Sequence, residues 1–547
     1  MPNVNATVKK ISALTTVIAF LIVSAFYTVF YFYPVGKVLN YGTGFSTVSR
    51  VFNSSATWKV IWFTTWQAIV STFISVIVGI CIANVFTKFE FRGKQVLKAL
   101  AIIPFVMPTV VVATAFISVN DFLHLNGTPF SLQGSTLGII VAHVFFNTAI
   151  VIRTVGSIWP QIDFESEMAA RTLGANSCTT FFRVTLPQLK TSIFASASLA
   201  FLFTFTSFGV ILLLGGLEKA TLETEIWRYA TQRTDFETAA TLGIIQLVII
   251  IIMLAVNTRS RSLITPAKKS AAAYNRSNYT NPRLIRLRLT SCIVFITGFL
   301  GLPFAILIER SLSASNGYSF QYYKQIFLES SERFSIFGTR RAIFNSLLWA
   351  SLAMVIATIL GLLAAVLMTH KSKKISRSSD IFLLLPLGTS GVLIGFGIIV
   401  GLNTSILDVR SEWWIVPVAQ SILGVGFVSR IVSTAITNQD PELKQAAQTL
   451  GAGPAKVWWH IDMPIVSRSL VAGATFAFAI AIGEFGATAF LARPQRPTIP
   501  TAVFNLLGRP GAATFGQAMA LSVILALITA TAVSLLERTG QVVGNEI

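Results

Sequence analysis

Charged residues are scarce in this sequence, and acidic ones are the scarcest. Only 12% of its 547 residues are charged and 53% are hydrophobic, whereas about a quarter of an ordinary soluble chain is charged. Its 42 Lys and Arg outnumber its 22 Asp and Glu, which gives a formal net charge of +20. The shortage of charge excludes an ordinary soluble globular protein.

Residues that perform chemistry are also few. No G-x-x-x-x-G-K-[ST] motif occurs, so the chain is not expected to cradle the phosphates of ATP. Three cysteines without metal-ligand spacing predict buried thiols: Cys81, Cys178 and Cys292. Four scattered histidines form no catalytic group: His124, His143, His370 and His460. The sequence therefore predicts a protein that is not an enzyme, with no metal site and no cofactor in this chain.

Long apolar runs recur along the whole chain. A run of about 20 apolar residues crosses a bilayer core, and it must be helical because lipid offers no partners to backbone N–H and C=O groups. The predicted fold class is therefore an all-α polytopic membrane protein with about twelve transmembrane helices. The predicted spans are roughly 11–33, 58–86, 97–119, 133–156, 191–215, 237–257, 286–309, 342–369, 380–402, 413–435, 467–491 and 514–536.

The spans divide into two halves of six. A segment at 258–285, rich in Ser, Ala, Asn, Lys and Arg, is predicted to be a cytoplasmic linker between a first half at 1–257 and a second half at 286–547. Six is an even number, so both halves enter the membrane in the same direction and form a parallel repeat. Most of the basic residues then fall on the side that holds both termini, which predicts that this side is cytoplasmic.

Two polar islands lie at equivalent places in the two halves. The first, at 163–187, reads DFESEMAARTLGANSCTTFFRVTLP, and the second, at 440–464, reads DPELKQAAQTLGAGPAKVWWHIDMP. They align without a gap at one constant offset, which places Asp163 on Asp440 and Pro187 on Pro464. Each is predicted to form a short helix, a sharp turn that requires glycine, and a second short helix before the next span. Both islands are expected to face the cytoplasm.

This pattern resembles the signature of permease subunits of bacterial ATP-binding-cassette importers, which is E-A-A, three residues, G, nine residues and I-x-L-P. The corresponding positions are Met168, Ala169, Ala170, Gly174, Leu186 and Pro187 in the first copy, and Gln445, Ala446, Ala447, Gly451, Met463 and Pro464 in the second. Met168 and Gln445 stand where the family has an acidic residue, and Met463 replaces its leucine. No specific salt bridge is carried over from the acidic position.

The resemblance implies a type I importer permease fold and a set of partners. In that family the island is a coupling helix that fits a groove on an ATPase subunit. Two ATPase subunits on the cytoplasmic face would bind Mg-ATP, and an extracytoplasmic binding protein would deliver the cargo. The localisation implied is the bacterial inner membrane, and no nucleic-acid partner is expected.

The phrases VAHVFFN, FTFTSFGVILLLGG and GEFGATAFL are similar to those of fused thiamine and ferric-iron permeases. Thiamine or ferric iron is therefore the expected cargo, with sulfate, molybdate or a polyamine as alternatives. An ion-coupled secondary transporter is the rival class, but it usually needs paired acidic groups at mid-membrane and often an inverted repeat.

Five residues are candidates for a substrate pathway. Phe201 and Phe208 recur at the positions of Phe478 and Phe485, seven residues apart, which predicts that each pair shares one helical face. Such rings would stack on a cationic heteroaromatic ring, or they would simply pack between helices. Glu484 is the only clear carboxylate inside a span, and the alternative to a pathway role is a structural one, either an ion pair with Arg493 or Arg496 or a helix–helix contact.

Overall fold

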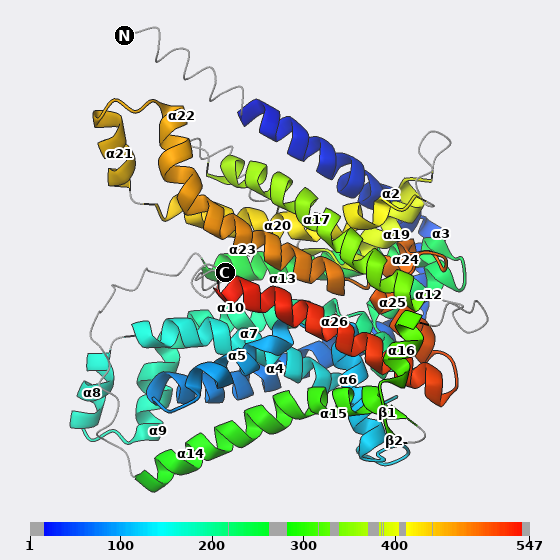
Figure 1. Cartoon of the computed structure of the whole chain (residues 1–547), viewed down its shortest axis with the longest axis horizontal. Helices are drawn as coiled ribbons and strands as arrows, with labels where there is room; N and C mark the ends of the chain where they lie inside the picture. The colour runs from blue at the N-terminus through cyan, green and yellow to red at the C-terminus, as the bar shows by residue number, and fades with distance from the viewer. Residues whose placement is uncertain are drawn as a thin grey trace. The chain divides into compact units, whose positions relative to one another are not determined.

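The computed structural model describes residues 16–162, 164–216, 218–261, 282–314, 317–328, 338–369, 382–383, 385–386, 388–403, 412–439 and 441–538. Helices dominate this part of the chain (Figure 1). Its β-structure is a two-stranded antiparallel sheet of β1 (Ser313–Ala314) and β2 (Gly317–Tyr318). The all-α fold class is confirmed, whereas most of the predicted linker at 258–285 lies outside the described residues.

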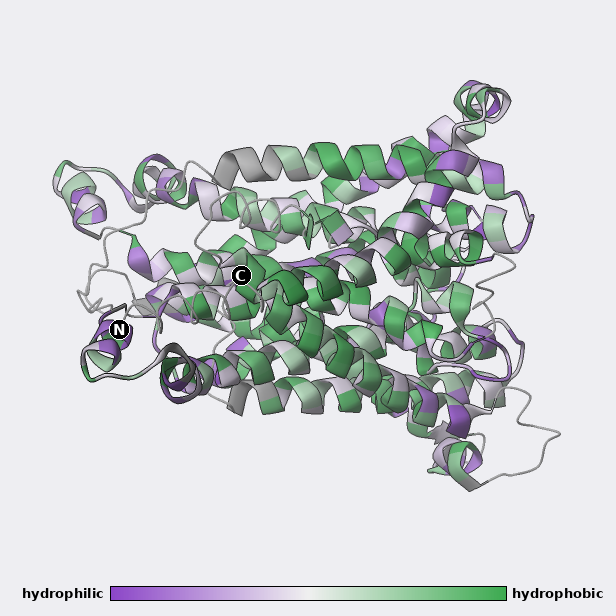
Figure 2. Cartoon of the chain, turned by 90° about the horizontal axis from the view of Figure 1, so that it is seen from above, coloured by the Kyte–Doolittle hydropathy of each residue, from purple (hydrophilic) through white to green (hydrophobic). Residues whose placement is uncertain are grey.

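Nine helical stretches within the described residues are long and apolar enough to cross a membrane, and a bent helix pair makes a tenth. In Figure 2 the middle parts of the long helices are mostly hydrophobic, and hydrophilic residues gather at helix ends and in short helices. Ten of the twelve predicted spans are thus found. The nine are Thr16–Gly42, Ser55–Lys88, Thr136–Gln161, Phe236–Met253, Arg286–Leu312, Thr339–Met368, Ile415–Thr437, Trp458–Gly483 and Ala512–Leu535.

The tenth span, predicted as one helix at 97–119, is broken in the middle. Helix α5 (Lys94–Val106) and helix α6 (Thr109–Phe122) meet at an angle of 108°. Pro108 supplies no N–H, and a proline disfavours the helical region for the residue before it. Met107 is accordingly extended, with φ −67° and ψ 137°. The single kinked helix expected here is replaced by two helices that turn sharply.

Three further predicted spans differ from the expectation. The run at 191–215 divides into α10 (Leu186–Phe205) and the short α11 (Gly209–Leu214). The equivalent run in the second half divides into α23 (Met463–Gly483) and α24 (Thr488–Leu491). Of the run at 380–402, the described part holds α19 (Gly391–Gly401), which has 11 residues.

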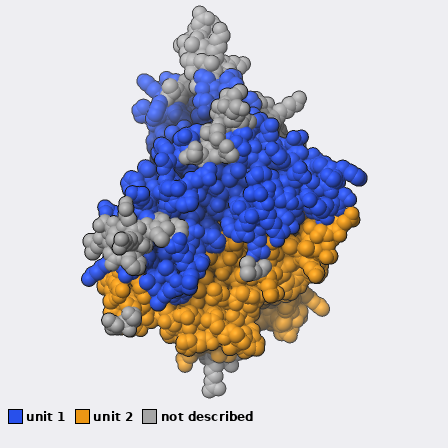
Figure 3. Space-filling model, turned by 90° about the vertical axis from the view of Figure 1, so that its right-hand side faces the viewer, with its two compact units in different colours: residues 1–51, 226–244, 323–547 blue, residues 52–225, 245–322 orange. Residues whose placement is uncertain are grey.

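The chain forms two compact units that do not follow its sequence halves (Figure 3). Unit 1 contains 1–51, 226–244 and 323–547, and unit 2 contains 52–225 and 245–322. Within unit 1, α2 (Tyr33–Gly42) from the start of the chain packs on α19 of the second half. Within unit 2, α15 (Leu302–Leu312) packs on α6 of the first half. The first span of each half therefore belongs to the unit built mainly from the other half.

Each unit is built around the same three-helix core. In unit 2, α4 (Ser55–Lys88), α7 (Thr136–Ile158) and α10 pack on one another. In unit 1 the equivalent helices α17 (Thr339–Met368), α20 (Ile415–Thr437) and α23 do the same.

Glycine permits one close helix crossing in both cores. A Cβ on Gly79 would lie 2.5 Å from Val151 Cβ, and a Cβ on Gly361 would lie 2.6 Å from Val428 Cβ. Val151 and Val428 correspond to each other at the same offset that aligns the polar islands. The internal repeat predicted from the islands thus extends to the packing of the cores.

Side-chain contacts repeat as well. The Leu222 N–H donates to Thr64 Oγ1 at 3.0 Å, and the Ile499 N–H donates to Ser346 Oγ at 2.7 Å. These bonds fix the starts of α12 (Leu222–Thr231) and α25 (Ile499–Leu507). The segment around α12 carries charges of both signs, yet Leu222 and Glu223 are fully buried. Glu223 accepts a hydrogen bond from Gln246, which satisfies a polar group that would be costly to bury alone.

Four π-helical turns interrupt the long helices in the described part of the chain, and each precedes a proline. They are η1 (Thr28–Phe32), η3 (Phe181–Thr185), η4 (Ile296–Gly301) and η5 (Trp458–Asp462). The helices that follow carry their proline in the first two positions. Proline has no N–H to give to the carbonyl four residues back, so the preceding turn widens.

The remaining elements include the helices of three of the spans above, α13 (Phe236–Arg261), α14 (Pro282–Phe295) and α26 (Ala512–Arg538). The others are short helices between the spans or at their ends: α3 (Phe45–Asn53), η2 (Trp159–Gln161), α8 (Phe164–Thr172), α9 (Ser177–Thr180), α16 (Gln321–Leu328), α21 (Pro441–Thr449) and α22 (Pro454–Val457). The cysteine prediction holds only for Cys292, because Cys81 and Cys178 are exposed.

Candidate functional site: two repeated polar loops

The first polar island folds as predicted into two short helices joined by a sharp turn. Helix α8 ends in a hydrogen-bonded cap: the Ala175 N–H donates to Ala170 O at 3.0 Å, and the Gly174 N–H donates to Arg171 O at 3.0 Å. This pair of bonds is the Schellman arrangement, in which the residue after the helix is left-handed. Gly174 accordingly has φ +86°. Asn176 then accepts from the Thr179 N–H at 2.8 Å and starts α9.

The second island repeats this cap bond for bond. The Ala452 N–H donates to Ala447 O at 3.0 Å, the Gly451 N–H donates to Gln448 O at 3.0 Å, and Gly451 has φ +80°. A Cβ on either turn glycine would meet nothing within 4 Å. Glycine is thus required by the backbone conformation and not by lack of space. We call 164–187 the first coupling loop and 441–464 the second coupling loop.

The two coupling loops present the same residues to the outside. Ala169 and Ala446 are exposed, whereas Ala170 and Ala447 are half-buried. Met168 is half-buried, but Gln445 at the equivalent position is exposed. Both loops return to the bundle at a proline-led helix start, with Leu186 and Pro187 opening α10 and Met463 and Pro464 opening α23.

Large exposed apolar side chains stand on both loops, and the sequence reasoning did not select them. Leu173 and Leu450 are each 88% exposed, Phe182 is 59% exposed and Trp459 is 64% exposed. The alignment of the islands pairs Leu173 with Leu450 and Phe182 with Trp459. The same exposed apolar positions therefore recur in both copies of the island. Extending the repeat alignment to every apolar residue of the islands would have paired them, but the sequence does not show that they are exposed.

The structure changes the geometry expected for the pathway phenylalanines. Phe201 lies in α10, but Phe208 follows the break at the end of that helix. Phe478 lies in α23, whereas Phe485 follows its end at Gly483. The two members of each pair therefore do not share a continuous helical face, and that prediction is wrong. The cause is the helix break, which spacing alone did not reveal.

Two of these rings have an aromatic neighbour. Phe201 stacks on Phe205 with ring centroids 5.5 Å apart, and Phe485 lies 5.8 Å from the ring of Phe504. Phe208 and Phe485 are buried, while Phe478 is half-buried. A pathway role for the four phenylalanines stays a prediction.

Glu484 makes a local contact instead of the predicted arginine ion pair. Its Oε1 accepts the Ala487 N–H at 2.7 Å, and its Oε2 accepts the Thr488 N–H at 3.1 Å. A Cβ on Gly391 would lie 2.5 Å from the Glu484 Oε1, so the carboxylate rests against the start of α19. Glu484 thus holds the turn before α24 on α19.

A buried polar cluster in the three-helix core of unit 2 was only partly foreseen. His143 Nδ1 lies 3.1 Å from Gln67 Oε1, and Asn147 Nδ2 donates to Thr204 Oγ1 at 2.7 Å. All four side chains are buried. His143 therefore has a partner on a neighbouring helix, Gln67 of α4.

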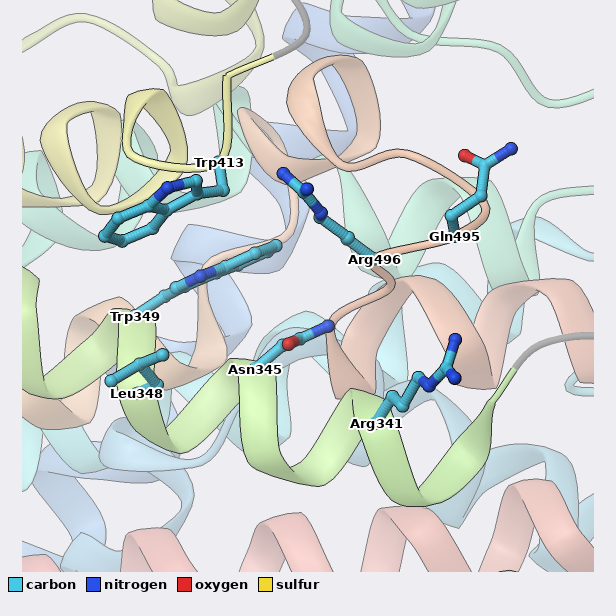
Figure 4. A pocket seen from close by; sticks show the side chains of 7 residues that line it. All are labelled: Arg341, Asn345, Leu348, Trp349, Trp413, Gln495 and Arg496. Carbon is cyan, nitrogen blue, oxygen red and sulfur yellow. The ribbon is translucent and has the colours of Figure 1, made fainter. Parts of the chain in front are cut away.

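Unit 1 has a surface hollow of about 330 Å³ near the start of α17 (Figure 4). Figure 4 shows Trp349 and Trp413 on one side of it and Arg496 between Trp413 and Gln495. Arg341, Asn345 and Leu348 line it from α17. None of the predicted coupling or pathway residues lies in this hollow. In the parts of the chain that the structure describes, no three His, Cys, Asp or Glu residues are grouped to hold a metal ion.

The chain matches a known family twice. The family described as "Binding-protein-dependent transport system inner membrane component" matches residues 75–265 and 336–539. Each match includes one coupling loop and most of one three-helix core. The two matches together cover more than half of the chain.

Relatives of similar length carry permease names. The chain is 23% identical over 518 residues to the thiamine transport system permease protein ThiP of Salmonella typhimurium, covering 90% of each chain. It is 22% identical over 480 residues to the probable ABC transporter permease protein y4fN of Sinorhizobium fredii, covering 84% of each.

A shorter relative matches about half of the chain. The putative 2-aminoethylphosphonate transport system permease protein PhnV of Salmonella paratyphi A is 25% identical over 265 residues, which is 47% of this chain and 95% of that protein. The chain thus belongs to the family of binding-protein-dependent transport system inner membrane components, as a fused, two-half permease of the ATP-binding-cassette importer type.

Proposed function

We propose that the two coupling loops are the docking points for two ATPase subunits, and that this chain converts their ATP-driven movement into cargo uptake. The observation that supports the proposal is the duplicated surface: the same capped helix and the same exposed apolar residues stand once in each half. Two copies related by the internal repeat suit a partner that is itself two-fold symmetric. Mg-ATP would be bound by those subunits and not by this chain.

The docking surface that we propose combines a small helix face with two apolar anchors. The exposed Ala169 and Ala446 let a partner approach the helix backbone closely. Leu173 and Phe182 on the first loop, with Leu450 and Trp459 on the second, offer apolar area that a groove would bury. Burial of a large apolar side chain contributes about 1.5–3 kcal/mol, so the two anchors on each loop would favour binding of one subunit.

This function implies the orientation of the chain in the membrane that we propose. Both coupling loops, both termini and the linker would face the cytoplasm, and the binding protein would approach from the opposite side. The distribution of basic residues supports this orientation.

Thiamine is the cargo that we propose. The name of the ThiP relative, which aligns along 90% of this chain, supports it. The PhnV name points to an aminoalkyl phosphonate, but that protein aligns with only 47% of this chain. Ferric iron, sulfate, molybdate and a polyamine are less supported alternatives. Uptake of labelled thiamine and of labelled 2-aminoethylphosphonate by cells that express the whole importer would separate the two leading candidates.

The turn glycines provide the sharpest test of coupling. Gly174→Val and Gly451→Val force a β-branched residue into a left-handed conformation that it adopts very rarely, so the cap should open and uptake should be lost. Gly453→Val is the matched control, because Gly453 has no positive φ and a Cβ there meets nothing within 4 Å. We expect normal membrane insertion of all three variants and loss of ATPase binding in the first two. Undiminished uptake by both turn variants would contradict the proposal.

A further inference from the structure

Each coupling loop is tied to its own stem by one side-chain contact. In the first loop, Thr185 Oγ1 donates to Glu167 Oε1 at 2.5 Å. In the second loop, Lys444 Nζ lies 2.9 Å from Asp462 Oδ1. Glu167 and Lys444 lie on the short helices α8 and α21, while Thr185 and Asp462 close the π-helical turns η3 and η5.

The two contacts occupy the same repeat positions. The alignment of the islands places Glu167 on Lys444 and Thr185 on Asp462. The chemistry is exchanged between them: the carboxylate is on the short helix in the first loop and on the stem in the second. The contact has thus been kept while both of its residues differ between the copies. Ordinary surface residues do not behave in this way.

The carboxylate of each contact is buried and therefore needs its partner. Glu167 is 5% exposed and Asp462 is 8% exposed. A carboxylate removed from water is costly unless it is paired or hydrogen-bonded. Each carboxylate therefore holds the short helix against the stem as long as its partner is present. The loops are otherwise exposed, so these are the buried charged anchors at their bases.

The first loop has an additional connection. Lys88 Nζ, at the end of α4, lies 3.6 Å from Glu167 Oε2. Glu167 consequently joins α8, η3 and α4, whereas the Lys444–Asp462 pair joins α21 and η5. Movement of α8 would be passed both to α4 and, through η3, to α10. Movement of α21 would be passed through η5 to α23.

We propose that Glu167–Thr185 and Lys444–Asp462 are two equivalent latches of opposite polarity that lock the coupling helices to the transmembrane bundle. These are positioning residues: they contact neither ATP nor cargo, and they transmit the displacement of a docked partner into the membrane helices. The inference rests on the proposed coupling function. Without the latches, the short helices would still dock, but they would move without taking the stems with them.

The test is to exchange the residue pairs between the two loops. A general loss of stability would not be reversed by the second substitution of such a pair, whereas a broken latch would be. Glu167→Lys alone places a lysine beside Lys88 and removes the acceptor of Thr185, so uptake per ATP hydrolysed should fall about tenfold or more, as expected for a broken buried pair. Glu167→Lys with Thr185→Asp rebuilds in the first loop the pair that the second loop uses. This double variant should recover the part of the coupling that depends on the latch, although the lysine still lies beside Lys88.

The second loop allows the reciprocal exchange. Lys444→Glu alone should uncouple, because it faces the carboxylate of Asp462, and Lys444→Glu with Asp462→Thr should recover. Glu167→Gln keeps an oxygen that accepts from Thr185 but loses the charge near Lys88, so it should have a smaller effect than Glu167→Lys. ATP hydrolysis and thiamine uptake are measured together on the importer reconstituted in liposomes with its ATPase subunits and its binding protein.

A second measurement needs only this chain. Spin labels at positions 173 and 188, introduced after Cys81 and Cys178 are replaced by serine, report the distance between the end of α8 and the start of α10. The distance distribution should be narrow with the native pair, broad in Glu167→Lys and narrow again in the double variant. Equal distributions in all three, or failure of both double variants to restore coupling, would overturn the latches.

The outcomes separate the latches from the function on which they rest. If the native chain fails to bind ATPase subunits or to couple at all, the proposed function is wrong. If the native chain couples normally and the single variants do so equally well, the latches alone are wrong.

Discussion

The cores of the two units share one scaffold but differ in polarity. In unit 2, α4, α7 and α10 enclose Gln67, His143, Asn147 and Thr204. In unit 1, the repeat positions equivalent to the last three hold Gln420, Gly424 and Ala481. A Cβ on Gly424 would lie 2.9 Å from Ala357 Cβ and 3.3 Å from Ala477 Cβ. One core is joined by side-chain hydrogen bonds, and the other by close contact of small residues.

This difference teaches that the three-helix scaffold does not need the polar cluster. Helices in membranes associate either through small residues that let backbones approach or through interhelical hydrogen bonds, and unit 2 has a hydrogen bond at the position where unit 1 has a contact of small residues. Gly79 and Gly361 remain common to both, because α4 and α17 cross α7 and α20 at similarly close distances. The devices can therefore be tested separately within one protein.

The largest effect is expected from Gly424→Leu in unit 1. No room exists for even a Cβ at that crossing, so α20 would have to separate from α17 and α23. Overpacking of this kind costs typically about 1–3 kcal/mol and sometimes more, and here we expect a loss of stably folded protein. The measurement is the melting temperature of the purified protein in detergent.

Asn147→Leu is the matched control in unit 2, since it places the same side chain at the equivalent repeat position. It should be tolerated better, because Asn147 already fills that space with a side chain of similar size. Equal melting temperatures for the two variants would refute the contrast between the cores.

An intermediate and equal effect is expected from Gly79→Ala and Gly361→Ala. Each would bring a Cβ to 2.5 or 2.6 Å from the Cβ of a valine on the facing helix. Both variants should lower stability by about 1–3 kcal/mol, to the same extent within error. Unequal losses in denaturant or thermal unfolding would show that the crossings are less alike than the shared distances indicate. Gly36→Ala is the control, because a Cβ there meets nothing within 4 Å.

The smallest effect is expected from the polar cluster. Asn147→Ala and Thr204→Val each remove one partner of the 2.7 Å bond, and their double-mutant cycle should give a coupling energy of about 0.6–2 kcal/mol. His143→Gln copies the residue that unit 1 has at Gln420, so it should change stability little. A coupling energy near zero would mean that the bond between α7 and α10 does not contribute to the polar core.

Much of the candidate site could be predicted from the islands alone. The T-L-G ends of α8 and α21, the left-handed turns and the proline-led stems follow from local sequence, because glycine and proline act within a few residues of their own position. The anchors Leu173 and Leu450 and the latch residues Glu167 and Lys444 were not selected. An exposed leucine and a buried glutamate look ordinary in a sequence, and only the structure shows how far each side chain is buried.

The membrane spans were predictable as apolar runs but not as unbroken helices. Pro108 is visible in the sequence, but the same local sequence is compatible with a mild kink in one helix or with the observed turn of 108° between two helices. The surrounding packing decides between them, since the freed carbonyls must find partners in neighbouring helices. For the same reason the spacing of Phe201 and Phe208 could not show that the helix ends between them.

The sequence by itself determined that this chain is helical, embedded in a membrane and duplicated, since apolar length, period and repeat offset are properties of the linear chain. Only the tertiary structure decided that the first span of each half packs in the unit of the opposite half, and that one core is polar while its copy is close-packed. It also paired Glu167 with Thr185 and Lys444 with Asp462. Those outcomes depend on contacts between residues that are far apart in the sequence, and such contacts leave no local signal in the order of the amino acids.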